Sequence, residues 1–128
     1  MAPLTYHNDL PGAPRAVGPY SQAVEINGII FLSGQVGIDP TSGTLVAGGF
    51  ETEVKQVIAN IKSVLTGVGL SLSHVVKATV FVTDLGQFAQ LNEIYGAEFG
   101  SAKPARTTIQ VSKLPLGASV EIEVLASR

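Results

Sequence analysis

The chain has 128 residues, which fits one domain able to bury roughly two thirds of its unfolded surface. Its net charge is −2, only 14% of its residues are charged and it has no cysteine, so disulfides and cysteine-ligated zinc are excluded and a basic nucleic-acid surface is disfavoured. So few charges predict that other subunits cover part of the surface. Since the chain shows neither a signal-peptide pattern nor an apolar run of about 18 residues, we expect a soluble, cytoplasmic protein.

The N-terminal part combines prolines with a hairpin signal. Four of the seven prolines fall within residues 1–19, which predicts an extended arm over about residues 1–17. The short apolar runs 23–26 and 29–33 follow it, joined by Asn27-Gly28. This dipeptide favours a type I′ turn, because both of its positions take a positive φ, and it predicts a β-hairpin.

The middle of the chain predicts a helix and then a strand. From Phe50 the apolar residues recur at three- and four-residue spacing, which is typical of an amphipathic helix, and Gly67 and Gly69 are suited to end it. Residues 75–82 form a β-branched run, which predicts a strand buried on both faces.

A second helix and two further strands complete the order of elements. Asp84 resembles an N-cap, and the apolar stripe of the helix after it comprises Phe88, Leu91, Tyr95 and Phe99. Two strands follow, over 106–112 and 118–126, joined around residues 114–117.

The order β-β-α-β-α-β-β predicts an α+β fold with one sheet. Two helices cannot cover both faces of five or six strands, so we expect both on one face. If the last two strands form a hairpin, one set of polar side chains shares the face that the helices leave bare: Arg106, Thr108, Gln110, Glu121 and Glu123. Guanidinium and carboxylates together, in a chain this apolar, indicate a functional site or a subunit interface.

Arg106 is the only one of the three arginines that lies within a predicted element. A planar cation on a rigid strand suits bidentate capture of a carboxylate, although a surface arginine paired with a nearby acid has the same appearance. Tyr20, at the entrance to the first hairpin, is equally open to packing or function.

Other catalytic patterns find little support. His7 and His74 lie far apart in the sequence, so we predict no metal site and expect solvated or capping histidines. Ser21 and Ser33 lack the context of a nucleophile elbow, and the chain has no dinucleotide or phosphate-binding glycine loop. The residues themselves therefore predict a small α+β domain with a polar face centred on Arg106.

Five motifs carry a specific resemblance. In chain order they are GPYSQA at 18–23, LSGQ at 32–35, VKATVFV at 76–82, PART at 104–107 and VEIE at 120–123. Together, over residues 18–126, they resemble the Rid (YjgF) family. Within it they are most similar to the RidA branch of 2-iminobutanoate/2-iminopropanoate deaminases.

The resemblance implies a fold, an assembly and a reaction. The fold would be chorismate-mutase-like, and the protein would be a homotrimer with its sites in clefts between subunits. RidA-type members hydrolyse 2-imino acids, or 2-enamine tautomers such as 2-aminoacrylate, to 2-oxo acids and ammonia. They need no cofactor and no metal.

The resemblance also implies the site residues. Arg106 would hold the substrate carboxylate, helped by backbone N–H groups near Gly34 and Thr108. Glu121 would orient or activate the attacking water. Three further polar positions would line the cleft, the first of them also helping to move protons: Tyr20, Ser33 and Asn92.

One departure and several alternatives accompany this hypothesis. Many RidA proteins have cysteine at the position of Thr108, so cysteine-based redox regulation is disfavoured here. The same pocket also suits a non-catalytic 2-oxo acid sensor. An endoribonuclease or translation inhibitor fits the acidic charge poorly, and a purely structural or chaperone-like role has no positive mark in the sequence.

Overall fold

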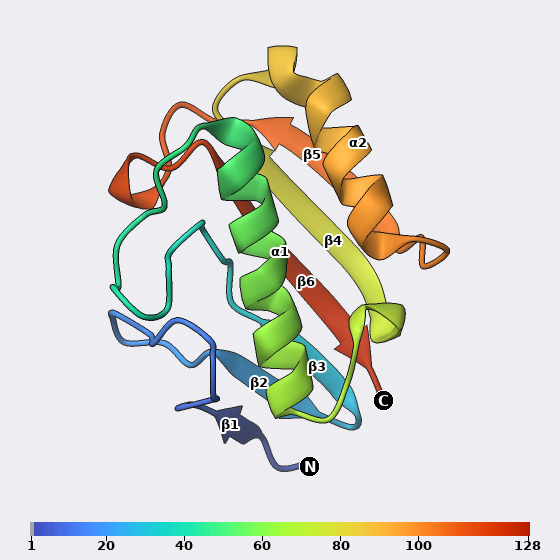
Figure 1. The fold of residues 1–128 in the computed structure, drawn as a ribbon. Coiled ribbons are helices and arrows are strands. Elements are labelled where there is room, and N and C mark those ends of the chain that lie inside the picture. Colours follow the sequence, from blue (N-terminus) through green and yellow to red (C-terminus); the bar gives the residue numbers. More distant parts are fainter. Residues whose placement is uncertain (1) are drawn as a thin grey trace.

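The computed structural model describes residues 2–128, so Met1, the first residue of the expected arm, lies outside the described residues. The strands form one mixed sheet of six, in the order β1-β2-β3-β6-β4-β5 (Figure 1). Their bounds are Thr5–His7 (β1), Ala23–Ile26 (β2), Ile29–Leu32 (β3), Val75–Val82 (β4), Ala105–Gln110 (β5) and Val120–Ser127 (β6).

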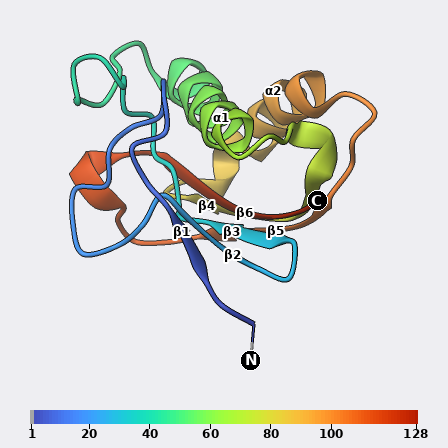
Figure 2. The ribbon, with the colours of Figure 1, turned by 90° about the horizontal axis from the view of Figure 1, so that it is seen from below.

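Both α-helices pack on the same face of this sheet, which confirms the one-sided arrangement (Figure 2). They are α1 (Phe50–Gly67) and α2 (Phe88–Phe99). The core lies between the helices and the sheet, where apolar stripes of period 3.6 meet strand residues of period 2. Its most buried members include Val54, Val57, Ile58, Ile61, Val64, Leu65 and Leu91 from the helices and Ile30, Ala78, Val80, Ile122 and Val124 from the strands.

The first hairpin forms as the sequence predicts, but the arm is only partly extended. Asn27 and Gly28 have φ values of 51° and 78°, as a type I′ turn requires. The arm contains β1, which pairs antiparallel with β2 through Tyr6 and Val24. A three-residue strand at a sheet edge is too short for its alternation to be recognised in the sequence.

The last two strands do not form the expected hairpin. Strand β5 pairs parallel with β4, placing Arg106 beside Ala78, and β6 lies between β3 and β4, antiparallel to both. The segment β4-α2-β5 is therefore a strand–helix–strand unit, for which parallel pairing is the rule. The Pro115–Gly117 segment forms a 3₁₀ turn on the way to β6.

Only one face of β4 is buried within the single chain, so the expectation that both of its faces are buried is wrong for the single chain. Ala78 and Val80 point toward the helices and are fully buried, whereas Thr79 and Phe81 on the other face are partly exposed. That other face also carries Phe31 and Ile109, which are 45% and 41% exposed.

Two local details differ from expectation. Asp84 does act as a cap, accepting a hydrogen bond from Gly86 N at 2.8 Å, but it caps a 3₁₀ turn over Leu85–Gln87 that precedes α2. Phe88, expected in the apolar stripe, is 43% exposed.

Among residues 2–128, no helix has the length and apolarity needed to cross a membrane.

Candidate functional site

Arg106 and Glu121 lie on opposite faces of the sheet. Arg106 pairs with Ala78, whose side chain is in the helix-side core, so Arg106 shares the helix side. Glu121 pairs with Phe81, on the bare face. The expectation that one bare face carries both groups is therefore wrong, because β5 continues the sheet beyond β4 in parallel register instead of turning back beside β6.

The same register places the rest of the expected polar face. On the helix side, Gln110 Oε1 accepts a hydrogen bond from Leu85 N at 2.9 Å, and the Oγ1 of Thr108 is buried. Glu123, paired with Thr79, stays with Glu121 on the bare face. Alternation along each strand is as predicted, and only the face assigned to β5 changes.

Arg106 is held against α2. Its Nη2 donates a hydrogen bond to Asn92 Oδ1 at 2.7 Å, and its guanidinium carbon lies 5.5 Å and 4.9 Å from the ring centroids of Phe88 and Tyr95. Contacts of this kind orient a guanidinium while leaving most of its donors available. Burial raises the pKa of the Tyr95 hydroxyl, and the Arg106 charge opposes that rise. Arg106 and Asn92, both expected in the site, are thus brought together here.

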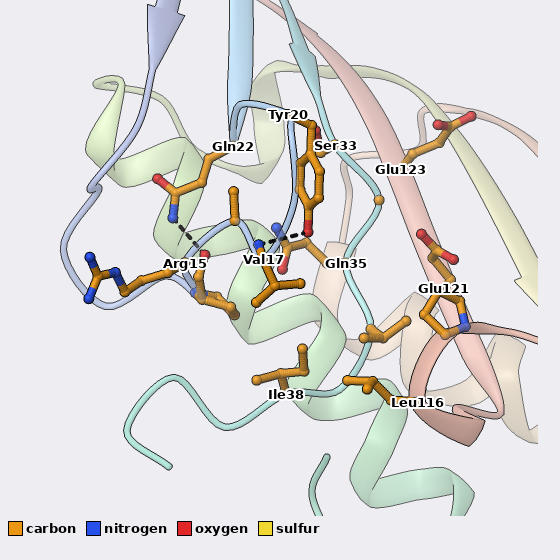
Figure 3. Close-up of a pocket in the computed structure, with 15 residues that line it drawn as sticks. Arg15, Val17, Tyr20, Gln22, Ser33, Gln35, Ile38, Leu116, Glu121 and Glu123 are labelled. Atoms are coloured by element: carbon orange, nitrogen blue, oxygen red, sulfur yellow. Dashed lines mark hydrogen bonds between the residues drawn. The ribbon is translucent and has the colours of Figure 1, made fainter. Parts of the chain in front are cut away.

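A cavity of about 490 Å³ holds four of the other expected residues (Figure 3). Tyr20, Ser33, Gly34 and Glu121 all line it, while Arg106, Asn92 and Thr108 belong to the opposite side of the sheet. The remaining lining residues come from the arm, from the segment after β3, from the 3₁₀ turn and from β6: Pro14, Arg15, Ala16, Val17, Gln22, Gln35, Val36, Ile38, Pro115, Leu116 and Glu123.

Gly34 is glycine because the Glu121 carboxylate packs onto it. Gln35 and Ile122 exchange backbone hydrogen bonds of 2.9 Å and 3.1 Å, which draws the segment after β3 against β6. A Cβ built on Gly34 would overlap Glu121 Oε2 and would lie only 3.0 Å from Cδ and 3.2 Å from Cγ. Ser33 is fixed alongside, because its hydroxyl donates to Ser21 O at 2.6 Å.

Glu121 is the best candidate base in the cavity. Burial raises the pKa of its carboxyl group, and the like charge of Glu123 adds to the rise. A carboxylate with a raised pKa accepts a proton more readily, and a perturbed carboxyl that lines a cavity is a typical feature of functional sites.

Tyr20 takes part in both packing and the cavity. It is half-exposed, and its hydroxyl accepts a hydrogen bond from Val17 N at 3.4 Å, which ties the arm to the entrance of β2. The ring also borders the cavity close to Ser33 (Figure 3).

Gln22 is a buried residue of the cavity that the sequence reasoning missed. Its Nε2 donates to Pro14 O at 2.6 Å, and its Oε1 accepts from Leu10 N at 3.0 Å. Gln22 therefore fixes the arm that forms one wall. One feature of the sequence indicates this role: a glutamine stands at the apolar entrance to a strand. A buried side-chain amide there needs hydrogen-bond partners, which the backbone of the arm supplies.

The two histidines serve local structure. His74 Nδ1 accepts a hydrogen bond from Ser71 N at 3.1 Å and so caps a 3₁₀ turn. His7 Nε2 lies 3.0 Å from Glu25 Oε1, and Arg128 Nε lies 2.6 Å from Glu25 Oε2. The hydrogen bond from Arg128, which has the larger effect, and the hydrogen bond from His7 together lower the pKa of Glu25 to about 2.

Comparison with known proteins gives the fold and the site a family. The profile of the family described as Endoribonuclease L-PSP matches residues 11–128. The protein DfrA of Myxococcus xanthus is 48% identical, over 98% of this chain and 96% of its own length. The 2-iminobutanoate/2-iminopropanoate deaminase of Mus musculus is also 48% identical, over 89% of this chain and 84% of its own length.

A solved structure agrees with these relatives. RidA from the Antarctic bacterium Psychrobacter has a TM-score of 0.88 and 44% identity, covering 91% of this chain and 94% of that chain. The mixed sheet with two helices on one face is thus the fold of the YjgF-type proteins. The chain belongs to the Rid (YjgF) family, to which the L-PSP proteins also belong.

Proposed function

We propose that the protein is a deaminase that hydrolyses 2-imino acids, and their 2-enamine tautomers such as 2-aminoacrylate, to 2-oxo acids and ammonia. The single observation that carries the proposal is the position of the Glu121 carboxyl at a cavity that Ser33 and Tyr20 also line. Burial, and then the like charge of Glu123, raise the pKa of this carboxyl. The mouse relative, 48% identical, bears the name of such a deaminase.

The chemistry needs little beyond a placed water and a proton acceptor. A protonated imine carbon is already electrophilic, so the water oxygen adds to it while Glu121 takes a proton from the water. The protonated Glu121 then returns the proton to the nitrogen of the carbinolamine. The C–N bond then breaks, and the nitrogen leaves with the bonding electron pair as ammonia. The hydroxyl becomes the carbonyl as its proton passes through Glu121 to the ammonia, so the zwitterionic imino acid plus water becomes the 2-oxo acid anion plus ammonium.

Arg106 supplies the carboxylate clamp in this proposal. Its contacts with Asn92, Phe88 and Tyr95 fix the guanidinium plane, which suits bidentate capture of a carboxylate. Strand β5 is at the edge of the sheet, so one row of its backbone groups faces away from β4 and is available near Thr108. Gly34 would offer a further backbone N–H to the substrate carboxylate from the cavity that holds Glu121.

Since Arg106 and Glu121 lie on opposite faces of one sheet, we infer that each site combines Arg106 of one subunit with Glu121 of another in a homotrimer. The bare face carries partly exposed Phe31, Phe81 and Ile109, which suit a subunit interface. A closed threefold ring joins two different surfaces of the same chain, as such a site requires.

The charge of the cavity favours an imino acid over RNA. Glu121 and Glu123 both line it, with Arg15 as the one basic side chain of the lining, and this excess of carboxylates disfavours a phosphate backbone. An imino acid, in contrast, brings a cationic nitrogen that carboxylates attract. The endoribonuclease alternative thus has weaker physical support than deamination, although the family description carries that word.

The test of the reaction is an assay in which an amino acid oxidase generates fresh imines. We expect ammonia and 2-oxo acid to appear faster than in spontaneous hydrolysis, and Glu121→Gln to slow kcat by roughly 10²–10⁴-fold. Binding of 2-oxo acids without any acceleration would refute deamination in favour of a sensor. A larger loss in Glu123→Gln than in Glu121→Gln would assign the base to Glu123.

Mixing two inactive variants tests the shared site. Trimers refolded from equal amounts of Arg106→Ala and Glu121→Gln chains should regain about a quarter of the wild-type activity, because each site draws its arginine and its glutamate from different chains, each intact with probability about one half. A site built within one chain would regain none. Light scattering that gives a monomer at micromolar concentration would refute the trimer itself.

A further inference from the structure

Leu116 combines an unfavourable backbone conformation with an exposed apolar side chain. It has φ 62° and ψ 17° inside the 3₁₀ turn Pro115–Gly117, a left-handed conformation that glycine or asparagine adopts more easily. Its side chain is 64% exposed. Neither feature serves the hydrophobic core, and backbone strain of this kind is typical of functional positions.

Leu116 belongs to an aliphatic wall of the cavity. Val17, from the arm, and Ile38, from the segment after β3, line the same cavity. Figure 3 shows Leu116 and Ile38 together on one side, with Tyr20 and Ser33 across from them. Glu121 lies to the side of both pairs, and Val17 lies beside the Tyr20 hydroxyl, to which its backbone N–H donates at 3.4 Å. The cavity therefore offers aliphatic side chains in addition to the polar groups around the proposed base.

Buried polar side chains hold the segments that carry this wall. From α1, Asn60 Nδ2 donates to Ile38 O at 2.9 Å, and Glu53 Oε1 accepts from Ser119 N at 2.9 Å, just beyond the 3₁₀ turn. Gln22 holds the arm through Pro14, three residues before Val17. A wall held in this way loses little entropy on contact with a ligand.

We propose that Leu116, with Val17 and Ile38, forms a subsite for the aliphatic side chain of the substrate, so that imino acids with branched four-carbon side chains are preferred to the three-carbon imino acid. The inference rests on the proposed function. The cavity of about 490 Å³ is within the range of roughly 300–1,000 Å³ typical of drug-sized ligands. A three-carbon imino acid held near Glu121 would leave the aliphatic wall without a contact.

The test compares imines made from leucine and from alanine. In Leu116→Asn, kcat/KM for the leucine-derived imine should fall about 5- to 50-fold, within the range that aliphatic contacts supply, and that for the alanine-derived imine by less than about twofold. Thermal unfolding should show an unchanged or higher Tm, because asparagine tolerates the left-handed backbone. Leu85→Asn is the matched control: Leu85 is 41% exposed and lies outside the cavity lining, so the ratio of the two imines should stay at the wild-type value.

Binding measurements separate failure of the subsite from failure of the proposed function. Calorimetric titration with 4-methyl-2-oxopentanoate and with pyruvate should show a preference for the former that Leu116→Asn removes. A wild-type protein that hydrolyses imines with an unchanged ratio in Leu116→Asn would overturn the subsite and leave the deaminase intact. If no imine is hydrolysed, the proposed function fails, and the ratio of the two oxo acid affinities alone decides on the subsite.

Discussion

The contact between Gly34 and Glu121 makes Gly34→Ala a direct test of the proposed base. An alanine Cβ would overlap Glu121 Oε2 and press on Cδ at 3.0 Å and Cγ at 3.2 Å. The backbone at this point cannot retreat, because the next residue, Gln35, is bonded to Ile122 in both directions. The carboxylate must therefore move.

The size of the effect follows from the displacement. A misplacement of about 1 Å costs on the order of 100-fold in rate, and complete loss of a positioned acid–base group costs up to about 10⁴-fold. We therefore expect kcat of Gly34→Ala to fall by at least about 100-fold, equivalent to about 2.7 kcal/mol. Gly96→Ala is the control, since a Cβ on Gly96 meets nothing within 4 Å, and its kcat should be unchanged.

A double mutant shows whether the loss passes through Glu121. If Gly34→Ala acts by moving the carboxylate, adding it to Glu121→Gln should cost little more than Glu121→Gln alone, because groups that act as a unit are not additive. Steady-state rates of 2-oxo acid release give the four values of the cycle. Multiplicative losses, or a Gly34→Ala enzyme with wild-type kcat, would refute the placement of Glu121 at the reacting carbon.

Three further predictions follow from charges in the structure. Arg106→Ala should lower kcat/KM by roughly 30- to 5,000-fold, the equivalent of about 2–5 kcal/mol, with Arg106→Lys also poor and the mass by light scattering unchanged. Glu123→Gln should move the acid limb of the kcat/KM profile to lower pH, because it removes the like charge that raises the pKa of Glu121. Glu25, whose pKa falls from 4.5 to about 2 on folding, stabilises the fold above pH 4.5 and loses that contribution as the pH falls toward 2, so Glu25→Gln should flatten the dependence of Tm on pH in that window.

The local pattern of the sequence was enough to locate most elements. The helical spacing from Phe50 predicts α1, and the β-branched run 75–82 predicts β4. Both agree closely with the structure, because each element has a local pattern of its own in the sequence. The Asn27-Gly28 turn was equally informative, since its backbone conformation is encoded by the two residues themselves.

The order of the strands was not available from local pattern. Residues 114–117, with proline and glycine, resemble a hairpin turn, and they led to an antiparallel pairing that does not exist. The strand–helix–strand rule would have given the parallel pairing of β4 with β5, because a helix of twelve residues separates them. Alternation along β5 correctly groups Arg106 with Thr108 and Gln110 on one face of the strand. Only the pairing of β5 with β4 shows that this face is the one that α2 covers.

The missed parts of the site have a common physical reason. Gln22 and Leu116 matter through contacts with residues distant in the sequence: an arm carbonyl and an aliphatic wall from three segments. Gly34 is expected in the site for its backbone N–H, but its packing against the Glu121 carboxylate also depends on a distant contact. Such contacts leave no periodic mark. The motif GPYSQA points to the right segment, but the role of its glutamine emerges only from the arm that folds over it.

The sheet itself explains why the proposed enzyme would need more than one chain. Arg106 is fixed on the helix side by Asn92, while Glu121 is fixed on the bare side by its packing on Gly34, and no side-chain rotation carries either group through the hydrogen-bonded strands between them. Assembly would then create the site as well as cover the half-exposed face of β4. Activity per chain should accordingly fall on dilution, in step with loss of the assembled mass, whereas a site complete within one chain would keep its activity at any concentration.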